Sequence, residues 1–288
     1  MKILVTGAKG QLGSDVMKEL RDVPHIGVDV GDFDITDKSA VFAAFDVIKP
    51  ASVIHCAAYT AVDKAEDEPE LCRQVNEEGT RNIADACRKI GARIVYVSTD
   101  YVFSGIGSHF YKPNDAAEPV SIYGKTKLAG EKAVIEASSK YIIVRTSWVF
   151  GQGGGNFVNT MLRLGKERDS INVVNDQIGS PTYAADLAWL LVAMSKSEKY
   201  GIYHATNEGI CSWAEFASEI FLAANMDATV NPIPSSEYPT KAKRPLNSRL
   251  CKDALVIAGF ERLPHWKNAL LRYLRFCYSP IAWGFNVS

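Results

Sequence analysis

Residues 2–13 read KILVTGAKGQLG, and this stretch decides the fold of the 288-residue chain. Its first part, Lys2–Thr6, is a short apolar and β-branched run, which is typical of a buried strand. The three glycines of residues 7–13 have the spacing G-x-x-G-x-x-G, and apolar residues at four-residue intervals over residues 12–20 then indicate a helix. Glycine permits a tight turn and lets a pyrophosphate approach the backbone at a helix N-terminus. The stretch therefore predicts a strand, a phosphate-binding turn and a helix.

The same alternation of strand and helix patterns continues through the first half of the chain. Further short apolar runs are His25–Val30, Ser52–Ala57, Arg93–Ser98 and Tyr141–Thr146. Helical patterns separate them at Lys38–Ile48, Glu70–Ile90 and about Ile122–Ala137. Short apolar strands separated by helices indicate a parallel sheet that is covered on both faces. The sequence thus predicts an α/β fold with a doubly wound parallel sheet of the Rossmann type.

The pattern becomes less regular after Gly151, where the Gly-rich stretch Gln152–Asn156 follows. We expect a dinucleotide-binding domain over residues 1–151, with a segment near 183–207 that returns to the main sheet. A smaller C-terminal substrate-binding α/β domain is expected over residues 152–182 and 208–288. Within it, the proline-rich stretch Asn231–Pro245 is typical of a surface loop.

The charge balance excludes several classes of partner. The formal net charge is −1, so the chain lacks the long-range field that binds nucleic acid or an anionic membrane surface. No apolar run approaches the roughly 20 residues that span a bilayer, and the N-terminus does not resemble a secretory signal. We therefore expect a soluble, cytoplasmic protein with no nucleic-acid and no membrane partner. Both a monomer and a homodimer remain open.

The six cysteines are scattered, and none has the spacing of a zinc site. We expect free thiols in a reducing compartment and predict no metal site.

A dinucleotide is the ligand that the glycine turn predicts. Asp29 lies 22 residues after Gly7, where an acid binds the adenosine ribose, and its charge favours NADH. Lys9 favours NADPH instead, because it can pair with a 2′-phosphate, so we expect NADPH or NADH. Asp34 and Ile35 are expected at the adenine, although they fit the start of a helix equally well. The cofactor-binding candidates here are Gly7, Lys9, Gly10, Gln11, Leu12, Gly13, Asp29, Asp34 and Ile35.

Tyr123 and Lys127 lie four residues apart on an expected helix, so both side chains lie on one face. A tyrosine normally has a pKa near 10, and a nearby ammonium group lowers it. Such a Tyr123 can give a proton to a carbonyl oxygen while hydride reaches the carbon. Ser98 and Thr99 end a strand, where open α/β sheets bind ligands, so a hydroxyl there can hold the substrate oxygen. Alternatively, the two hydroxyls only cap the strand.

Several longer runs carry a resemblance to a known family. They are CAAYTAVDKAE (56–66), STDYVF (98–103), YGKTK (123–127), RTSWV (145–149), NDQIGSPT (175–182) and RPLNSRL (244–250). With the glycine turn, these runs resemble the dTDP-4-dehydrorhamnose reductases, a family in the extended branch of the short-chain dehydrogenases. The resemblance covers most of the chain.

The resemblance implies reduction of the C4 ketone of dTDP-4-dehydro-L-rhamnose to dTDP-L-rhamnose by NADPH or NADH. It makes Tyr123 the general acid, Lys127 the group that tunes it and anchors the nicotinamide ribose, and Thr99 the hydroxyl that orients the carbonyl. It places Ala57, Ala58 and Tyr59 beside the nicotinamide, and Asp100, Tyr101 and Trp148 on the sugar. Weaker candidates, for the nucleotide side of the substrate, are Asn156, Gln177, Arg244 and Ser248.

Other interpretations remain open for two residues and for the function. Trp148 also fits a core position, and Arg244 also fits a solvated loop. The fold would equally suit another nucleotide-sugar epimerase, dehydratase or ketoreductase. A non-catalytic regulatory subunit, resembling the partner of methionine adenosyltransferase, is a further alternative.

Overall fold

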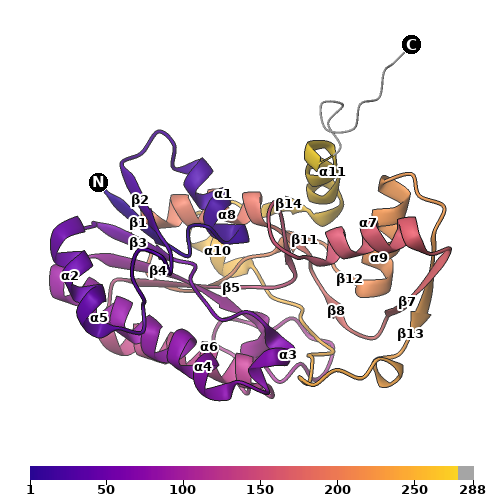
Figure 1. Cartoon of the computed structure of the whole chain (residues 1–288), viewed down its shortest axis with the longest axis horizontal. Helices are drawn as coiled ribbons and strands as arrows, with labels where there is room; N and C mark the ends of the chain where they lie inside the picture. Colours follow the sequence, from indigo (N-terminus) through magenta and orange to yellow (C-terminus); the bar gives the residue numbers. More distant parts are fainter. Residues whose placement is uncertain (278–288) are drawn as a thin grey trace, which may run out of the picture.

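Six parallel strands form the central sheet, in the order β10-β5-β4-β3-β1-β2 (Figure 1). The structure is a computed structural model and describes residues 1–277. The strands are β1 Ile3–Thr6, β2 His25–Val28, β3 Ser52–His55, β4 Arg93–Thr99, β5 Tyr141–Thr146 and β10 Gly201–His204. The strand order reverses between β1 and β3, and ligands of doubly wound sheets bind at such a switch point. The predicted fold class is confirmed.

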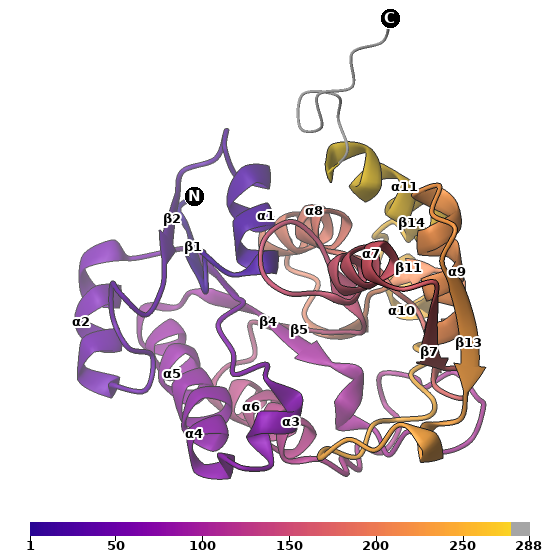
Figure 2. The same ribbon diagram turned by 45° about the vertical axis from the view of Figure 1, so that its right-hand side comes forward.

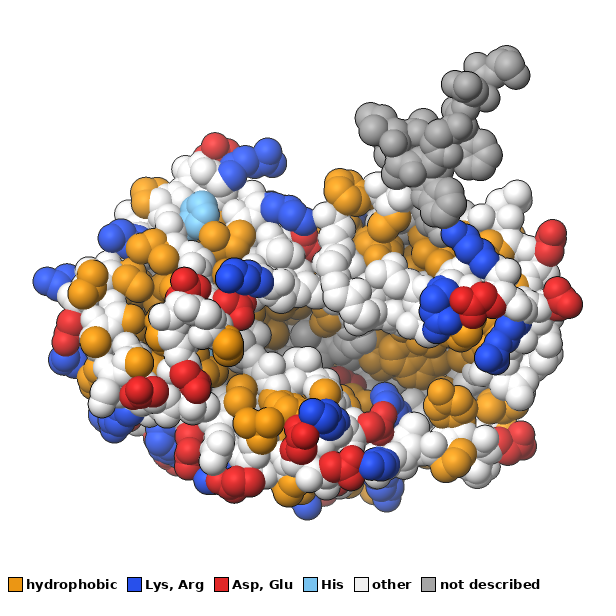
Figure 3. Space-filling model, in the orientation of Figure 1, with side chains coloured by type: hydrophobic (Ala, Val, Ile, Leu, Met, Phe, Trp, Pro, Cys, Tyr) orange, Lys and Arg blue, Asp and Glu red, His pale blue; other side chains and the backbone are white. Residues whose placement is uncertain are grey.

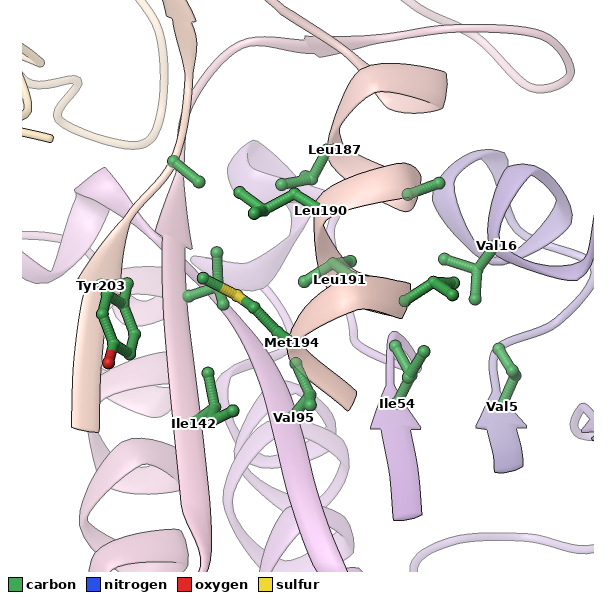
Figure 4. Packing of buried hydrophobic residues seen from close by; sticks show 14 of the residues in the cluster. Val5, Val16, Ile54, Val95, Ile142, Leu187, Leu190, Leu191, Met194 and Tyr203 are labelled. Carbon is green, nitrogen blue, oxygen red and sulfur yellow. The ribbon is translucent and has the colours of Figure 1, made fainter. Parts of the chain in front are cut away.

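Helices cover both faces of the sheet, as the apolar strands require. Helices α1 (Gln11–Glu19) and α8 (Ala184–Ser195) pack on one face. Helices α2 (Lys38–Ile48), α5 (Thr80–Ile90) and α6 (Ile122–Ala137) pack on the other. Along β1 the side chains alternate, since Ile3 and Val5 face the first layer whereas Leu4 faces the second. Figure 4 shows the first layer, where leucines of α8 lie over Ile54, Val95 and Ile142.

The predicted helix over Glu70–Ile90 is interrupted. It consists of α4 (Pro69–Arg73), the π-helical segment Gln74–Gly79 and α5. Within the π-helical segment, the side-chain amide of Asn76 bonds both backbone groups of Tyr59: its oxygen accepts from the N–H at 2.8 Å and its nitrogen donates to the carbonyl at 3.1 Å. The segment thus fixes the loop that follows β3.

A second apolar core lies beyond β5. Its main elements are α7 (Phe157–Glu167), α9 (Trp213–Ala223), α11 (Trp266–Cys277), and the paired strands β7 (Ser170–Val174) and β13 (Thr229–Ile233). Figure 2 shows β7 and β13 side by side at the edge of this half. The expected surface loop Asn231–Pro245 therefore begins as a strand, because residues 231–233 pair with β7.

Short elements complete the chain. They are α3 (Val62–Ala65), β6 (Val149–Phe150), β8 (Ile178–Gly179), β9 (Thr182–Tyr183), β11 (Asn207–Glu208), β12 (Cys211–Ser212), α10 (Asp253–Ile257) and β14 (Leu263–His265). After α8, strand β10 pairs in parallel with β5. The division into two domains stays a prediction, and residues 278–288 of the expected second domain lie outside the described residues. Within residues 1–277, no helix has the length and apolar character needed to cross a membrane.

The packing of α8 predicts a large loss of stability for Leu191→Ala, because Leu191 is fully buried against the sheet. Truncation of such a side chain costs about 2–5 kcal/mol of unfolding free energy. Urea unfolding measures this loss, with Leu222→Ala as the control. Leu222 lies on α9 and is 74% exposed, so its loss should change stability by only about 0.5 kcal/mol. Equal effects in the two variants would contradict the assigned packing.

Candidate active site

A cavity of about 880 Å³ lies at the carboxyl ends of the parallel strands. Figure 3 shows the surface hollowed between the two halves of the molecule. The lining comes from the glycine turn, the ends of β2, β3, β4 and β5, and the first turns of α6. The cavity therefore spans the switch point of the sheet.

The glycine turn is shaped by close backbone contact. Gly7 has φ +66°, and a Cβ atom on it would lie 2.7 Å from the backbone nitrogen of Ala57. A Cβ on Gly13 would overlap the carbonyl oxygen of Gly7. Both positions thus exclude side chains, so the start of α1 lies directly against the cavity, as a phosphate-binding turn requires.

The carboxylate of Asp29 lies at the cavity and bonds the glycine turn. Its Oδ2 accepts from the backbone N–H of Lys9, and its Oδ1 accepts from that of Val30, both at 2.9 Å. Asp34 and Ile35 also line the cavity. Asp34 does not cap α2; the cap is Asp37, whose side chain accepts from two N–H groups at the start of that helix.

Tyr123, Lys127 and Thr99 line one wall of the cavity. The first two come from α6, which Ser121 caps by accepting a hydrogen bond from the Gly124 N–H at 3.1 Å. A Cβ on Gly124 would overlap the Tyr101 carbonyl oxygen, so this glycine lets the helix start directly beside the segment that follows β4. Thr99 ends β4.

Burial raises the pKa of Tyr123 above its usual value, while a hydrogen bond with Thr99 acts in the opposite direction. Nearby Asp100 and Tyr101 raise it further. The expectation of a lowered tyrosine pKa is therefore wrong here, because burial outweighs the stabilising contacts. At neutral pH Tyr123 is protonated and can donate its proton.

Lys127 is almost completely buried, with 2% of its surface exposed. Its Nζ donates to the carbonyl of Val97 at 2.8 Å and lies 4.1 Å from the centre of the Tyr96 ring. Burial lowers the pKa of Lys127 to about 7, whereas the Glu131 carboxylate raises it.

Asp100 is a third buried titratable group in the cavity wall. Burial raises its pKa to about 6, and hydrogen bonds from Ser248 and Thr99 oppose this shift. Ser248 donates to Oδ2 of Asp100 and lies outside the lining, so it reaches the cavity only through this carboxylate. Tyr101, the next residue, lines the cavity.

Trp148 lines the cavity in a strained conformation, since its φ of +50° is unusual for a residue with a Cβ atom. Its ring stacks on Trp213, with centroids 3.7 Å apart and planes 14° apart. The residue thus belongs both to the second core and to the cavity wall, and its contact with the sugar stays a prediction. Strained backbone of this kind is concentrated at functional sites.

Four further candidates also have side chains outside the cavity lining. The Tyr59 hydroxyl donates to Glu68 at 2.8 Å, and Tyr59 does not line the cavity, whereas Ala57 and Ala58 do. Asn156 caps α7 and donates to Gln11 at 3.1 Å, and Gln177 donates to Ser235 at 2.9 Å. Arg244 is not a solvated loop charge, because it pairs with Asp63 at 2.6 Å and also interacts with Tyr101.

Some lining residues were not predicted. They include Phe33, Cys56, Thr60, Val62, Val75, Ser147, Gly154 and Gly155. Thr60 and Val62 lie in the CAAYTAVDKAE run and Ser147 lies in the RTSWV run, so adjacency to predicted residues was the available signal.

The glycine turn, the acid after β2 and the Tyr–Lys pair on one helix define an oxidoreductase of the short-chain dehydrogenase class. A family model described as the RmlD substrate binding domain matches residues 1–278. Over 284 residues the chain is 43% identical to the dTDP-4-dehydrorhamnose reductase of Aggregatibacter actinomycetemcomitans, covering 93% of this chain and 97% of that protein. The chain belongs to this family of dTDP-4-dehydrorhamnose reductases.

Two solved structures agree with this family assignment. The dTDP-4-dehydrorhamnose reductase of Clostridium acetobutylicum matches with a TM-score of 0.95 and 44% identity, over 96% of this chain and 100% of that one. The enzyme of the same name from Bacillus anthracis, solved in complex with NADP, matches with a TM-score of 0.93 and 45% identity, over 95% of this chain and 98% of that one.

The buried Lys127 predicts a stability penalty that depends on pH. Its folded-state pKa of about 7 lies below the roughly 10.4 of an unfolded lysine, so the penalty is complete below pH 7 and declines as pH rises towards 10. Lys127→Met should therefore raise the melting temperature at pH 6, and raise it less at pH 9. Thermal unfolding at both pH values measures this difference.

The control is Lys125→Met, which removes an exposed lysine from the same helix. It should leave the melting temperature nearly unchanged at both pH values. An increase for Lys127→Met that is the same at pH 6 and pH 9 would show that Lys127 is not charged at a cost in the folded protein.

Proposed function

We propose that this chain reduces the C4 keto group of dTDP-4-dehydro-L-rhamnose to give dTDP-L-rhamnose, with NADPH or NADH as the hydride donor. The observation that carries the proposal is the wall formed by Tyr123, Thr99 and Lys127, beside a phosphate-binding turn in one cavity. The family supports the same chemistry, because relatives similar over nearly the whole chain bear the name of this reductase.

The residues of the cavity fit a nicotinamide dinucleotide. The turn over residues 7–13 excludes side chains and leaves backbone N–H groups for the pyrophosphate. Asp29 and Lys9 would hold the adenosine ribose, with Asp34 and Ile35 at the adenine. Ala57 and Ala58 would lie beside the nicotinamide. When bound, the cofactor supplies a hydride to the keto carbon.

The protein supplies the proton. Tyr123, kept protonated by burial, donates its phenolic proton to the keto oxygen, and the carbon that receives hydride becomes a secondary alcohol. Thr99 orients the carbonyl by a hydrogen bond. The phenolate left on Tyr123 is stabilised by Thr99. The ammonium group of Lys127, one helical turn away on the same face of α6, would stabilise it further.

Other residues that line the same cavity would hold the nucleotide sugar. Asp100 and Tyr101 would contact the sugar, and the Trp148 ring, fixed by its stacking on Trp213, would cover one face. Arg244 lies beside Tyr101 and carries a guanidinium group that suits the pyrophosphate. Gln177, Asn156 and Ser248 would act through the groups that they bond, rather than as direct ligands.

A cytoplasmic location belongs to the same proposal. The six cysteines are all free, in agreement with a reducing compartment. A monomer or a homodimer, binding a dTDP-sugar as its small-molecule partner, stays a prediction.

Tyr123→Phe removes the proton donor and keeps the ring. We expect kcat for the keto sugar to fall by roughly 10²–10⁴-fold, because a positioned acid contributes about that much. Binding of NADPH, measured by calorimetry, should stay close to that of the wild type. Tyr238→Phe is the control, since Tyr238 is 57% exposed and should leave kcat unchanged. Near-normal turnover by Tyr123→Phe would exclude Tyr123 as the acid.

Asp29→Asn tests the cofactor preference without losing the oxygen that accepts from the Lys9 N–H. Removal of the negative charge should raise kcat/KM for NADPH relative to NADH, because the carboxylate repels a 2′-phosphate. Steady-state kinetics with both cofactors measure the ratio. Asp32→Asn removes a neighbouring exposed carboxylate and should leave the ratio unchanged. An equal ratio in Asp29→Asn and the wild type would mean that Asp29 does not face the 2′ position.

A further inference from the structure

A buried ion pair lies directly behind the wall that carries Tyr123 and Lys127. Glu131 and Arg145 are only 1% and 3% exposed. Arg145 donates twice to the carboxylate, from Nε to Oε1 at 2.9 Å and from Nη2 to Oε2 at 2.7 Å. Burying two charges costs desolvation energy that their attraction often does not recover, so stability alone is a weak reason for such a pair.

The pair links α6, which carries Tyr123 and Lys127, to the ends of β4 and β5. Ser98, on β4, donates its hydroxyl to Oε1 of Glu131 at 2.5 Å and directly precedes Thr99. Arg145, on β5, directly precedes the cavity residue Thr146. Glu131 itself lies on α6. One carboxylate therefore holds the ends of two strands against the helix.

Glu131 also lies one helical turn after Lys127 and two turns after Tyr123, so the three side chains share one face of α6. Within residues 1–277, the titratable groups around Lys127 come from four elements and one loop position. They are His55 from β3, Cys56 directly after it, Cys72 from α4, Tyr96 from β4, and Tyr123 and Glu131 from α6.

Burial keeps most of these groups neutral at pH 7. It lowers the pKa of His55 to about 3, raises that of Cys56 to about 12, and raises those of Cys72 and Tyr96. The negative charge beside Lys127 is thus supplied by Glu131, whose carboxylate Arg145 and Ser98 hold in place.

We propose that Glu131 is a positioning residue of this site. Its carboxylate keeps Lys127 in the ammonium form and fixes the position of α6, and so of Lys127, relative to Thr99. The proposal rests on the function proposed above, because that function requires a charged Lys127 beside the Tyr123 phenolate. On this proposal, the Glu131–Arg145 pair serves the reaction, and this explains why two charges are buried at a cost in desolvation energy.

The direct test is the pH titration of Lys127, followed by NMR of lysine labelled with ¹³C at Cε and assigned with Lys127→Met. In Glu131→Gln we expect the midpoint to move to lower pH by about one unit, because an adjacent opposite charge favours the charged form. The control is Glu136→Gln, which removes an exposed carboxylate from the same helix and should not move the midpoint. Coincident midpoints in Glu131→Gln and the wild type would overturn the proposal.

Kinetics give a second readout that a purely structural role would not change. As pH rises, kcat/KM should fall when Lys127 loses its proton, and this fall should begin at lower pH in Glu131→Gln. Glu131→Asp keeps the charge and should restore the wild-type profile. A uniform loss of activity at every pH would show that Glu131 only supports the fold. Absence of reductase activity in the wild type would instead refute the proposed function, and the NMR titration would still decide what Glu131 does to Lys127.

A folding defect is the foreseeable complication, because Glu131→Gln leaves the Arg145 guanidinium buried without a carboxylate. The double variant Glu131→Gln/Arg145→Met removes both charges. Its Lys127 midpoint should also lie below that of the wild type, and an unchanged midpoint would again overturn the proposal.

Discussion

The close approach of Gly7 to Ala57 is the constraint on which the rest of the structure depends. It brings the turn after β1 against the end of β3, at the point where the strand order reverses. With no side chain at Gly7 or Gly13, the start of α1 lies beside the cavity rather than behind a layer of side chains. The cavity and the wall that carries Tyr123, Lys127 and Thr99 follow from this geometry, because all the parallel strands end at the same edge of the sheet.

Burial then shifts the pKa values of the titratable side chains in the cavity wall. The same exclusion of water raises the pKa of Tyr123, lowers that of Lys127 to about 7 and raises that of Asp100 to about 6. A protonated tyrosine is the form that a reduction needs, since the product alcohol must receive a proton. A buried ammonium group is costly for folding, and the Glu131–Arg145 pair adds two more buried charges. The site therefore favours reactivity at the expense of stability.

Local features of the sequence were sufficient to predict much of the fold. The helices Lys38–Ile48 and Ile122–Ala137 have the predicted bounds, because apolar spacing and flanking turn residues mark them clearly. The strand expected at His25–Val30 ends two residues earlier, where Asp29 turns to bond Lys9. The π-helical segment Gln74–Gly79 was not predictable, since it depends on a contact between Asn76 and a distant loop.

Among the candidate site residues, too, the sequence could predict the positions of some and not of others. Tyr123, Lys127 and Thr99 reach one wall because each lies on an element whose position the topology determines. Contacts between distant parts of the chain have no local signal: Arg244 meets Asp63 across 181 positions. Periodicity could not reveal that Ser248 donates a hydrogen bond to Asp100, 148 positions away, because Asp100 lies in a three-residue 3-10 helix and Ser248 in a loop.

The most direct test follows the absorbance of reduced cofactor while the chain acts on dTDP-4-dehydro-L-rhamnose generated in situ, with the sugar product identified by NMR. The account predicts that one NADPH or NADH is consumed for each dTDP-L-rhamnose formed. Cofactor that binds without being consumed would contradict it, and would point to a redox-neutral sugar enzyme, a different keto sugar or a non-catalytic role.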